Sequence, residues 1–252
     1  MPIELTLVPE VRGPLSVYPV ASLRSLGVDV FVTDRFGGVS TGPYESLNLG
    51  VHVGDDLEAV AENRRRVANA IGATHLIIAR QVHGNTVVDA RDVTTTTEAD
   101  AISTTLAGLA LATLVADCVP ILLVDEESTR FSVVHAGWRG LASGVIGNAL
   151  AAYPFANAVH AFIGPCISRE GYQVGPEVAE QFANVSAGVV PDGGDRSRLD
   201  LQAVALHQLR SGGLRDDFIE ISTQHTDGGE VFFSDRAARP CGRFALVARR
   251  ES

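Results

Sequence analysis

Residues 109–140 read LALATLVADCVPILLVDEESTRFSVVHAGWRG, and this segment gives the clearest indication of architecture. Leu109 to Val115 and Ile121 to Val124 are continuous apolar runs, and Arg130 to His135 predicts another strand. Apolar runs without alternation are typical of strands that are buried on both faces. Such strands need a covering layer on each side. We therefore expect mixed β-sheets covered by helices, an α/β (α+β) fold.

Short β-rich runs alternate with helical stretches on either side of this segment. Val28 to Thr33 predicts a strand, and Asp56 to Ile71 predicts a helix that Asp55 or Asp56 caps and Gly72 ends. Further strands are expected at 75–82, 86–88, 159–163, 218–222, 231–234 and 244–248, further helices at 141–151, 176–182 and 201–209, and a surface loop at 192–197. Because no linker rich in proline and serine divides the chain, we expect a single domain over residues 1–252.

The composition is that of a globular protein with an acidic surface. The 252 residues are 46% hydrophobic and 20% charged, and the formal net charge is -10. This balance lacks the basic footprint of a nucleic-acid-binding protein and argues against an anionic membrane surface as partner. A small anionic substrate fits only if arginines gather locally. We therefore expect small-molecule partners.

The cysteines and the N-terminus both favour the cytoplasm. Cys118, Cys166 and Cys241 are odd in number and far apart, which argues against a disulfide framework. The chain begins without a cationic segment followed by a long apolar core, so we expect no signal peptide. The longest apolar stretch, Ala107 to Ala116, is too short to span a bilayer.

His83, Cys118 and His135 are the candidate metal ligands. Each lies at the end of an apolar run, where the ends of several strands can converge at one edge of a sheet. Two imidazoles and one thiolate leave one coordination position open on a divalent ion, the arrangement typical of catalytic zinc. The sequence spacing alone does not show that the three side chains meet.

Three other interpretations of these residues remain open. Copper also accepts such ligands and would bind avidly in vitro. The only methionine is Met1, however, and the seven histidines include no His-X-His pair, so copper redox chemistry is the weaker interpretation. Cys118 can instead be a buried core cysteine. It can also be a catalytic nucleophile with His135 as its base.

Several segments together resemble the YfiH-like laccase-domain family. The segments that carry the resemblance are 35–40, 46–50, 63–64, 81–84, 116–120, 135–140, 164–167 and 172–175. Among them the run His135-Ala136-Gly137-Trp138-Arg139-Gly140 is the most specific.

The resemblance implies a sandwich of mixed sheets flanked by helices and a zinc site at His83, Cys118 and His135. It also implies phosphorolysis of adenosine, inosine and 5'-methylthioadenosine, with adenosine deaminase activity. Polyphenol oxidase is an older name for the family, and some members have been linked to peptidoglycan precursors. The C-terminal part departs from the family pattern at Ser222, Asp235 and Cys241.

Candidate substrate residues follow from their types and positions. Arg139 lies at the start of an expected helix, where backbone N–H groups also attract anions. Asn48 and Gln81 can bind a sugar or base, or can equally brace loops. Arg35 and Arg64 are weaker anion candidates, because the run Arg64-Arg65-Arg66 is more typical of a solvated helix face.

Three further residues near the candidate ligands have a structural role at least as readily as a functional one. Asp117 is the carboxylate next to Cys118, but it is expected to face away from the metal if the strand continues. Trp138 can stack on a purine or belong to the core, and Cys166 can line the pocket or simply pack.

The leading hypothesis is therefore a zinc-dependent purine nucleoside phosphorylase with deaminase side activity. The alternatives are a Cys-His amide hydrolase acting on a peptidoglycan precursor, a copper-dependent polyphenol oxidase, and a zinc-stabilised binding protein without enzymatic activity.

Overall fold

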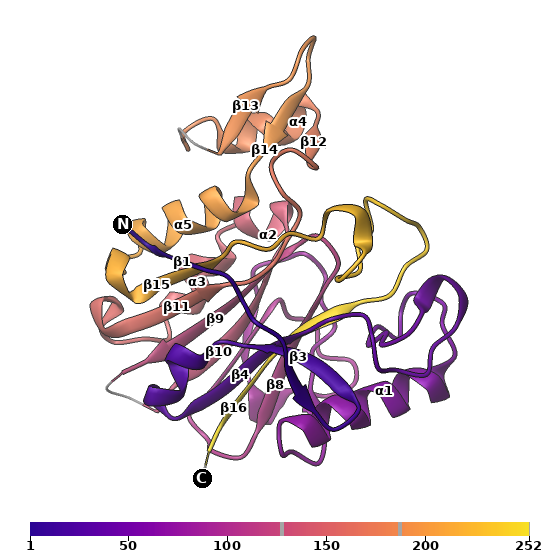
Figure 1. Cartoon of the computed structure of the whole chain (residues 1–252). Helices are drawn as coiled ribbons and strands as arrows, with labels where there is room; N and C mark the ends of the chain where they lie inside the picture. Colours follow the sequence, from indigo (N-terminus) through magenta and orange to yellow (C-terminus); the bar gives the residue numbers. More distant parts are fainter. Residues whose placement is uncertain (127–128, 186–187, 252) are drawn as a thin grey trace.

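Two large sheets pack face to face, and helices cover their outer faces (Figure 1). The structure, a computed structural model, describes residues 1–126, 129–185 and 188–251. Within those ranges no helix is both long and apolar enough to cross a membrane. The mixed sheets and the helices that cover them confirm the expected mixed α/β architecture.

The first sheet has seven strands in the order β1-β15-β11-β9-β10-β7-β6. Its strands are β1 (Ile3–Leu5), β6 (Val87–Asp89), β7 (Ala101–Thr104), β9 (Val119–Asp125), β10 (Phe131–Ala136), β11 (Val159–Ile163) and β15 (Ile219–Ser222). The central pair, β9 and β10, is antiparallel, and its register places His135 opposite Pro120. This register brings the end of β10 beside the start of β9, where Cys118 lies.

The second sheet has six strands in the order β2-β3-β4-β16-β8-β5. Its strands are β2 (Glu10–Arg12), β3 (Leu15–Pro19), β4 (Val28–Thr33), β5 (Leu76–Ile77), β8 (Ala110–Val115) and β16 (Phe244–Arg250). The turn at residues 116–118 links β8 in this sheet to β9 in the first. Cys118 therefore lies where the chain crosses from one sheet to the other.

The core explains why the apolar runs show no alternation. Ile121 and Leu123 on β9 face the helices, whereas Leu122 and Val124 face the second sheet. Phe244 packs in the same layer between the two sheets. Both faces of β9 are thus buried in apolar surroundings, as the continuous run predicts.

Helices cover both outer faces. The first sheet is covered by α2 (Trp138–Ala142), α3 (Val145–Leu150) and α5 (Leu201–Ser211), and the second by α1 (Leu57–Ala70). Asp56 caps α1 by accepting the N–H groups of Glu58 and Ala59. Short 3-10 helices occur at Ala21–Leu26, Gly42–Tyr44, Ala90–Asp92, Ala156–Ala158, Glu180–Phe182, Asp216–Phe218 and Asp227–Gly229.

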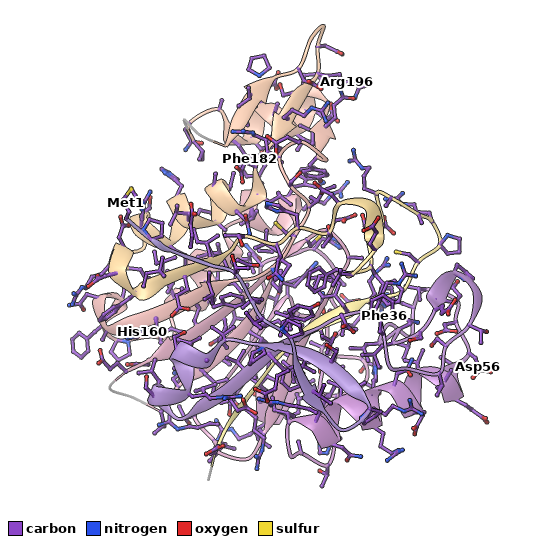
Figure 2. The ribbon with its side chains drawn as sticks, viewed as in Figure 1. Met1, Phe36, Asp56, His160, Phe182 and Arg196 are labelled. Carbon is purple, nitrogen blue, oxygen red and sulfur yellow. The ribbon has the colours of Figure 1, made fainter. Side chains whose placement is uncertain are left out.

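A small third sheet projects from the body beside α5 (Figure 1). It consists of β12 (Gln173–Val174), β13 (Val189–Pro191) and β14 (Ser197–Leu199), with α4 (Pro176–Ala179). Figure 2 shows Phe182 where this lobe meets the body and Arg196 near its tip. Phe182 is buried in the core beneath the lobe and anchors it.

Three secondary-structure predictions are wrong. The helix expected at 141–151 is two short helices, because Gly144 has φ 86° and breaks the chain between α2 and α3. Of the strand expected at 75–82, only Leu76–Ile77 forms a strand, and Arg80 makes an isolated bridge with Glu98. Residues 231–234 form no strand, and their backbone runs through a loop.

Candidate metal centre

The side chains of His83, Cys118 and His135 meet at the end of the first sheet. One nitrogen of each ring and the Sγ atom of Cys118 lie within 4.8 Å of one another. Cys118 Sγ is 3.9 Å from His83 Nε2, and the two imidazole rings stand edge to face with centroids 4.8 Å apart. His83 is exposed, Cys118 is half-buried and His135 is buried, so the group opens to solvent on the His83 side.

Asp100 holds two of these three residues in place. Its carboxylate accepts a hydrogen bond from Nδ1 of His135 at 2.8 Å. It also accepts hydrogen bonds from the backbone N–H groups of His83 at 2.9 Å and Gly84 at 2.7 Å. Because Nδ1 of His135 is engaged, Nε2 is the nitrogen left to face Cys118. A carboxylate that fixes the ring orientation of a histidine is a common support of metal ligands.

One residue in each of two tight turns beside the candidate ligands has a left-handed backbone conformation. His83 has φ 59° and Asp117 has φ 90°, in a region that residues other than glycine rarely adopt. In the first turn, the bonds from Asp100 to successive N–H groups hold the chain in this form. Such conformations concentrate at functional sites, where surrounding contacts maintain them.

Gly137 leaves room for the candidate ligands. A Cβ atom at this position would lie 2.9 Å from Cys118 Sγ and 2.9 Å from the Cδ2 atom of His83. These separations are shorter than van der Waals contact, so any larger residue would displace both side chains. The run His-Ala-Gly-Trp therefore needs glycine at its third position for steric reasons.

Electrostatic coupling joins Cys118 to His135. Burial opposes ionisation of the Cys118 thiol, but the charge of His135 and hydrogen bonds from His135 and His83 outweigh it and lower its pKa to about 6. Burial likewise opposes the charged form of His135, whereas Cys118 and Asp100 raise its pKa to about 9. Without metal, the two residues therefore form a thiolate–imidazolium pair near neutral pH.

The donor set fits a divalent metal ion. At typical bond lengths, two ligands of a tetrahedral zinc ion are about 3.3–3.6 Å apart, close to the 3.9 Å between Cys118 and His83. The lowered pKa of Cys118 favours the thiolate that a metal requires. In the part of the chain that the structure describes, this is the one group of three or more such side chains placed to hold an ion.

Asn48 and Gln81 are both engaged in bracing the backbone. Asn48 is fully buried and bonds to Gly50, Asp55 and the backbone N–H of Arg243. Gln81 uses both ends of its amide on the backbone of Leu114. A contact of either residue with a substrate stays a prediction.

Arg139 and Trp138 lie side by side next to the candidate ligands. The Arg139 guanidinium lies over the Trp138 ring at 4.3 Å from its centroid, and Arg139 is exposed at the start of α2. Trp138 is partly buried against the core. Arg139 therefore remains free to meet an anion, and its role stays a prediction.

Asp117 and Cys166 are directed away from the candidate ligands. Asp117 accepts Thr226 Oγ1 at 2.6 Å and the N–H of Arg236 at 2.7 Å, which ties the C-terminal loop to the turn that carries Cys118. Cys166 is fully buried, and burial raises its pKa well above the usual range. Cys166 therefore packs in the core.

The divergent C-terminal residues belong to the same loop. Asp235 pairs with Arg239 and Arg243, and Arg243 donates to the buried Sγ of Cys241 at 3.3 Å. Ser222 is buried, and its Oγ atom accepts a hydrogen bond from the backbone N–H of Gln224. Asp235 and Cys241 thus support Arg243 and do not contact His83, Cys118 or His135.

The sequence analysis missed Asp100 and His52. Asp100 directly precedes β7, so a single acid at the start of a buried strand was its only signal. His52 has no distinctive spacing. In the structure the pKa of His52 is lowered by partial desolvation and then by the charges of Arg243, Arg64, His83 and His135.

Comparison with known proteins shows which family the chain resembles. Residues 29–251 match the family described as "Multi-copper polyphenol oxidoreductase laccase". A protein of Corynebacterium glutamicum named purine nucleoside phosphorylase is 37% identical over 238 residues, which cover 89% of this chain and 95% of the relative. A purine nucleoside phosphorylase of Deinococcus radiodurans is 40% identical over 239 residues, covering 91% and 92%.

A solved structure extends the similarity to the fold. YlmD from Geobacillus stearothermophilus superposes with a TM-score of 0.90 at 28% identity, covering 98% of this chain and 100% of that one. Residues 29–251, which match the family description, include His83, Cys118 and His135. The chain therefore belongs to the YfiH-like laccase-domain family.

Proposed function

We propose that this protein is a zinc-dependent purine nucleoside phosphorylase acting on adenosine, inosine and 5'-methylthioadenosine, with adenosine deaminase as a side activity. The observation that carries the proposal is the group of His83, Cys118 and His135, arranged by Asp100 with one side open to solvent. The names of the relatives support the phosphorylase assignment. The absence of disulfides among the described cysteines supports a cytoplasmic location.

Phosphorolysis makes two demands that the chain's own residues can meet. An oxygen of phosphate bonds to C1' of the ribose while the C1'–N9 bond breaks, giving ribose 1-phosphate and a free purine that takes up a proton. Cationic side chains must hold the phosphate, and a positioned group must stabilise the charge that develops. Arg139 on one side of the candidate ligands, and Arg64 and Arg243 near His52, supply positive charge locally in an acidic protein.

Zinc is the metal that we propose for this centre. A zinc ion held by His83, Cys118 and His135 would supply a Lewis acid with one open position and would lower the pKa of a coordinated water. The same property supports deamination, in which water adds at C6 of adenosine and ammonia leaves. Copper binds the same ligands strongly, so its presence in a preparation would not identify the physiological ion.

Two alternatives have one observation each in their favour. The thiolate–imidazolium pair of Cys118 and His135 would also suit a Cys-His amide hydrolase. The family description favours a copper-dependent polyphenol oxidase. Within the described ranges, however, one group of three ligands is present instead of several, and Met1 is the only methionine.

Adenosine turnover by zinc-loaded protein of measured metal content tests the proposal. We expect adenine only when phosphate is present, and a smaller yield of inosine with or without phosphate. The Cys118→Ala variant, prepared in the same way, should give neither product. Failure to form either product with zinc bound would contradict the proposal, and oxygen uptake with a phenol or release of an amine from an amide would identify the alternative.

A further inference from the structure

The three consecutive arginines of α1 have different environments. Arg65 and Arg66 both pair with Glu62, at 2.7 Å and 2.8 Å. Arg65 is exposed, whereas Arg66 is half-buried and also donates to the backbone oxygen of Gly37 at 2.8 Å. Arg64 points the other way, and its Nε atom donates to the backbone oxygen of Leu49 at 2.9 Å. The interpretation of the whole run as a solvated face is therefore wrong for Arg64.

Leu49 connects Arg64 to Arg243, which is distant in sequence. The N–H of Leu49 donates to the backbone oxygen of Arg243 at 3.0 Å, while its carbonyl accepts from Arg64. The stem of Arg243 packs on Gly50, where a Cβ atom would come within 2.8 Å of its Cγ atom. Asn48 fixes this arrangement by accepting the N–H groups of both Gly50 and Arg243. The two arginines thus flank one short piece of backbone.

His52 follows that backbone. Arg243, bonded to the same backbone, lies at the end of the second sheet from which the chain leads to Cys118, because Phe244 pairs with Val115. The side chain of His52 is exposed and forms no hydrogen bond within the described part of the protein. Neighbouring atoms still remove part of its solvation, and this partial desolvation, then the charges of Arg243 and Arg64, and then those of His83 and His135, lower its pKa.

The Arg64 guanidinium is only partly satisfied. Its Nε is bonded to Leu49, whereas in the described ranges its two Nη atoms have no protein partner. Burial lowers the pKa of Arg64, which indicates that its charge is poorly solvated. Arg243 faces one carboxylate, Asp235, at 3.3 Å. A desolvated guanidinium with free N–H groups is well suited to an oxyanion, which it can bind through two parallel hydrogen bonds.

We propose that Arg64, His52 and Arg243 form a subsite for inorganic phosphate beside His83, Cys118 and His135. The two Nη groups of Arg64 and a ring N–H of His52 donate to the phosphate oxygens, and Arg243 adds positive charge. The identification of the anion as the reacting phosphate rests on the proposed phosphorylase function. The binding of a phosphate-like oxyanion does not depend on it.

The experiment measures phosphate binding and phosphate use separately. Inorganic phosphate is titrated into zinc-loaded protein by calorimetry, without nucleoside, and KM values for phosphate and adenosine are determined in parallel. Arg64→Met removes the charge and keeps the length of the side chain. Arg65→Met, one position along α1, is the matched control. Arg64→Lys restores a charge without the planar guanidinium.

We expect Arg64→Met to raise Kd and KM for phosphate at least tenfold, as for loss of a charge-assisted contact, with KM for adenosine and zinc content little changed. His52→Gln should raise both several-fold, Arg64→Lys should recover part of the loss, and Arg65→Met should behave as the parent protein. Unchanged phosphate binding in Arg64→Met and His52→Gln would overturn the subsite. So would equal losses for phosphate and adenosine with no recovery by lysine, because these indicate a structural role.

The outcome also separates the subsite from the proposed function. Phosphate binding that depends on Arg64 in a protein without nucleoside turnover would keep the subsite and reject the phosphorylase. Phosphate-dependent adenine formation that depends on Arg139 and not on Arg64 would keep the phosphorylase and overturn the subsite.

Discussion

Nδ1 of His135 donates to the carboxylate of Asp100 at 2.8 Å, a contact that fixes both the orientation of the ring and its free nitrogen. The same carboxylate accepts three backbone N–H groups of residues 82–84, among them that of His83. One buried side chain therefore positions two candidate ligands at once.

Replacing Asp100 with Asn should weaken both metal binding and folding. An amide accepts fewer hydrogen bonds than a carboxylate, and its NH2 group would face backbone donors. We expect zinc affinity, measured by competition with a chelator, to fall about 10- to 100-fold, and the free energy of unfolding to fall by about 2–3 kcal/mol. Asp92→Asn, at an exposed position, is the control. Parent-like zinc affinity in Asp100→Asn would exclude a positioning role.

Gly137→Ala should remove the metal without unfolding the protein. The added methyl group would lie 2.9 Å from Cys118 Sγ and would separate the ligands. Zinc content after dialysis and nucleoside turnover should both fall at least tenfold, while the far-ultraviolet circular dichroism spectrum stays unchanged. Gly147→Ala is the matched control, because a Cβ atom there meets nothing within 4 Å and lies in α3. It should stabilise the protein by up to about 1 kcal/mol. Full zinc occupancy in Gly137→Ala would contradict the steric argument.

Cys118 should be the selectively reactive thiol of the metal-free protein. Burial opposes its ionisation, but His135 and His83 lower its pKa to about 6, so the thiolate forms as the pH rises through 6. The paired imidazolium persists until the pH passes about 9. The rate of alkylation by iodoacetamide should therefore reach half its plateau near pH 6, well below the ordinary value of about 8.5.

Burial raises the pKa of both Cys166 and Cys241, which should stay unmodified in folded protein. The Cys118→Ala variant should accordingly take up no label at pH 7, and bound zinc should protect the parent protein. Because the pair with His135 causes the shift, His135→Asn should move the midpoint upward. A midpoint near pH 8.5 in the parent protein would show that the pair does not form.

Asp117→Ala should destabilise the protein but should not remove the general base of the reaction. Loss of the bonds to Thr226 and Arg236, at a residue with φ 90°, should lower the free energy of unfolding by about 2–3 kcal/mol. Chemical denaturation measures this loss, with the exposed Asp195→Ala as control. The pH dependence of the remaining turnover should keep its shape. Loss of one limb of that profile would instead make Asp117 the general base.

The central strands and the candidate ligands could be predicted from the sequence because their signals are local. The apolar run of β9 and the end of β10, where His135 is the last residue but one, are each visible within a few residues. The convergence of His83, Cys118 and His135 could not be predicted in this way, because it depends on the pairing of β7, β9 and β10.

The roles of polar residues were harder to predict because they depend on distant partners. Gln81 binds the backbone of Leu114, and Arg64 turns toward Leu49 although its neighbour Arg65 faces solvent. From their residue types alone, such side chains are expected to be exposed to solvent. Only the packing of α1 against the segment that precedes it shows which arginine is directed inward.

The position of β16 has a consequence for how the chain is made. This strand comes last along the sequence, yet it lies between β4 and β8 in the middle of the second sheet. Likewise β1, at the N-terminus, pairs with β15, with Ile3 opposite Glu220. During synthesis, β4 therefore presents an open edge until residues 244–250 have left the ribosome, and such edges invite aggregation. Removing residues 244–252 would withdraw the strand that joins the two halves of this sheet, so we expect shortened chains to be insoluble and not merely inactive.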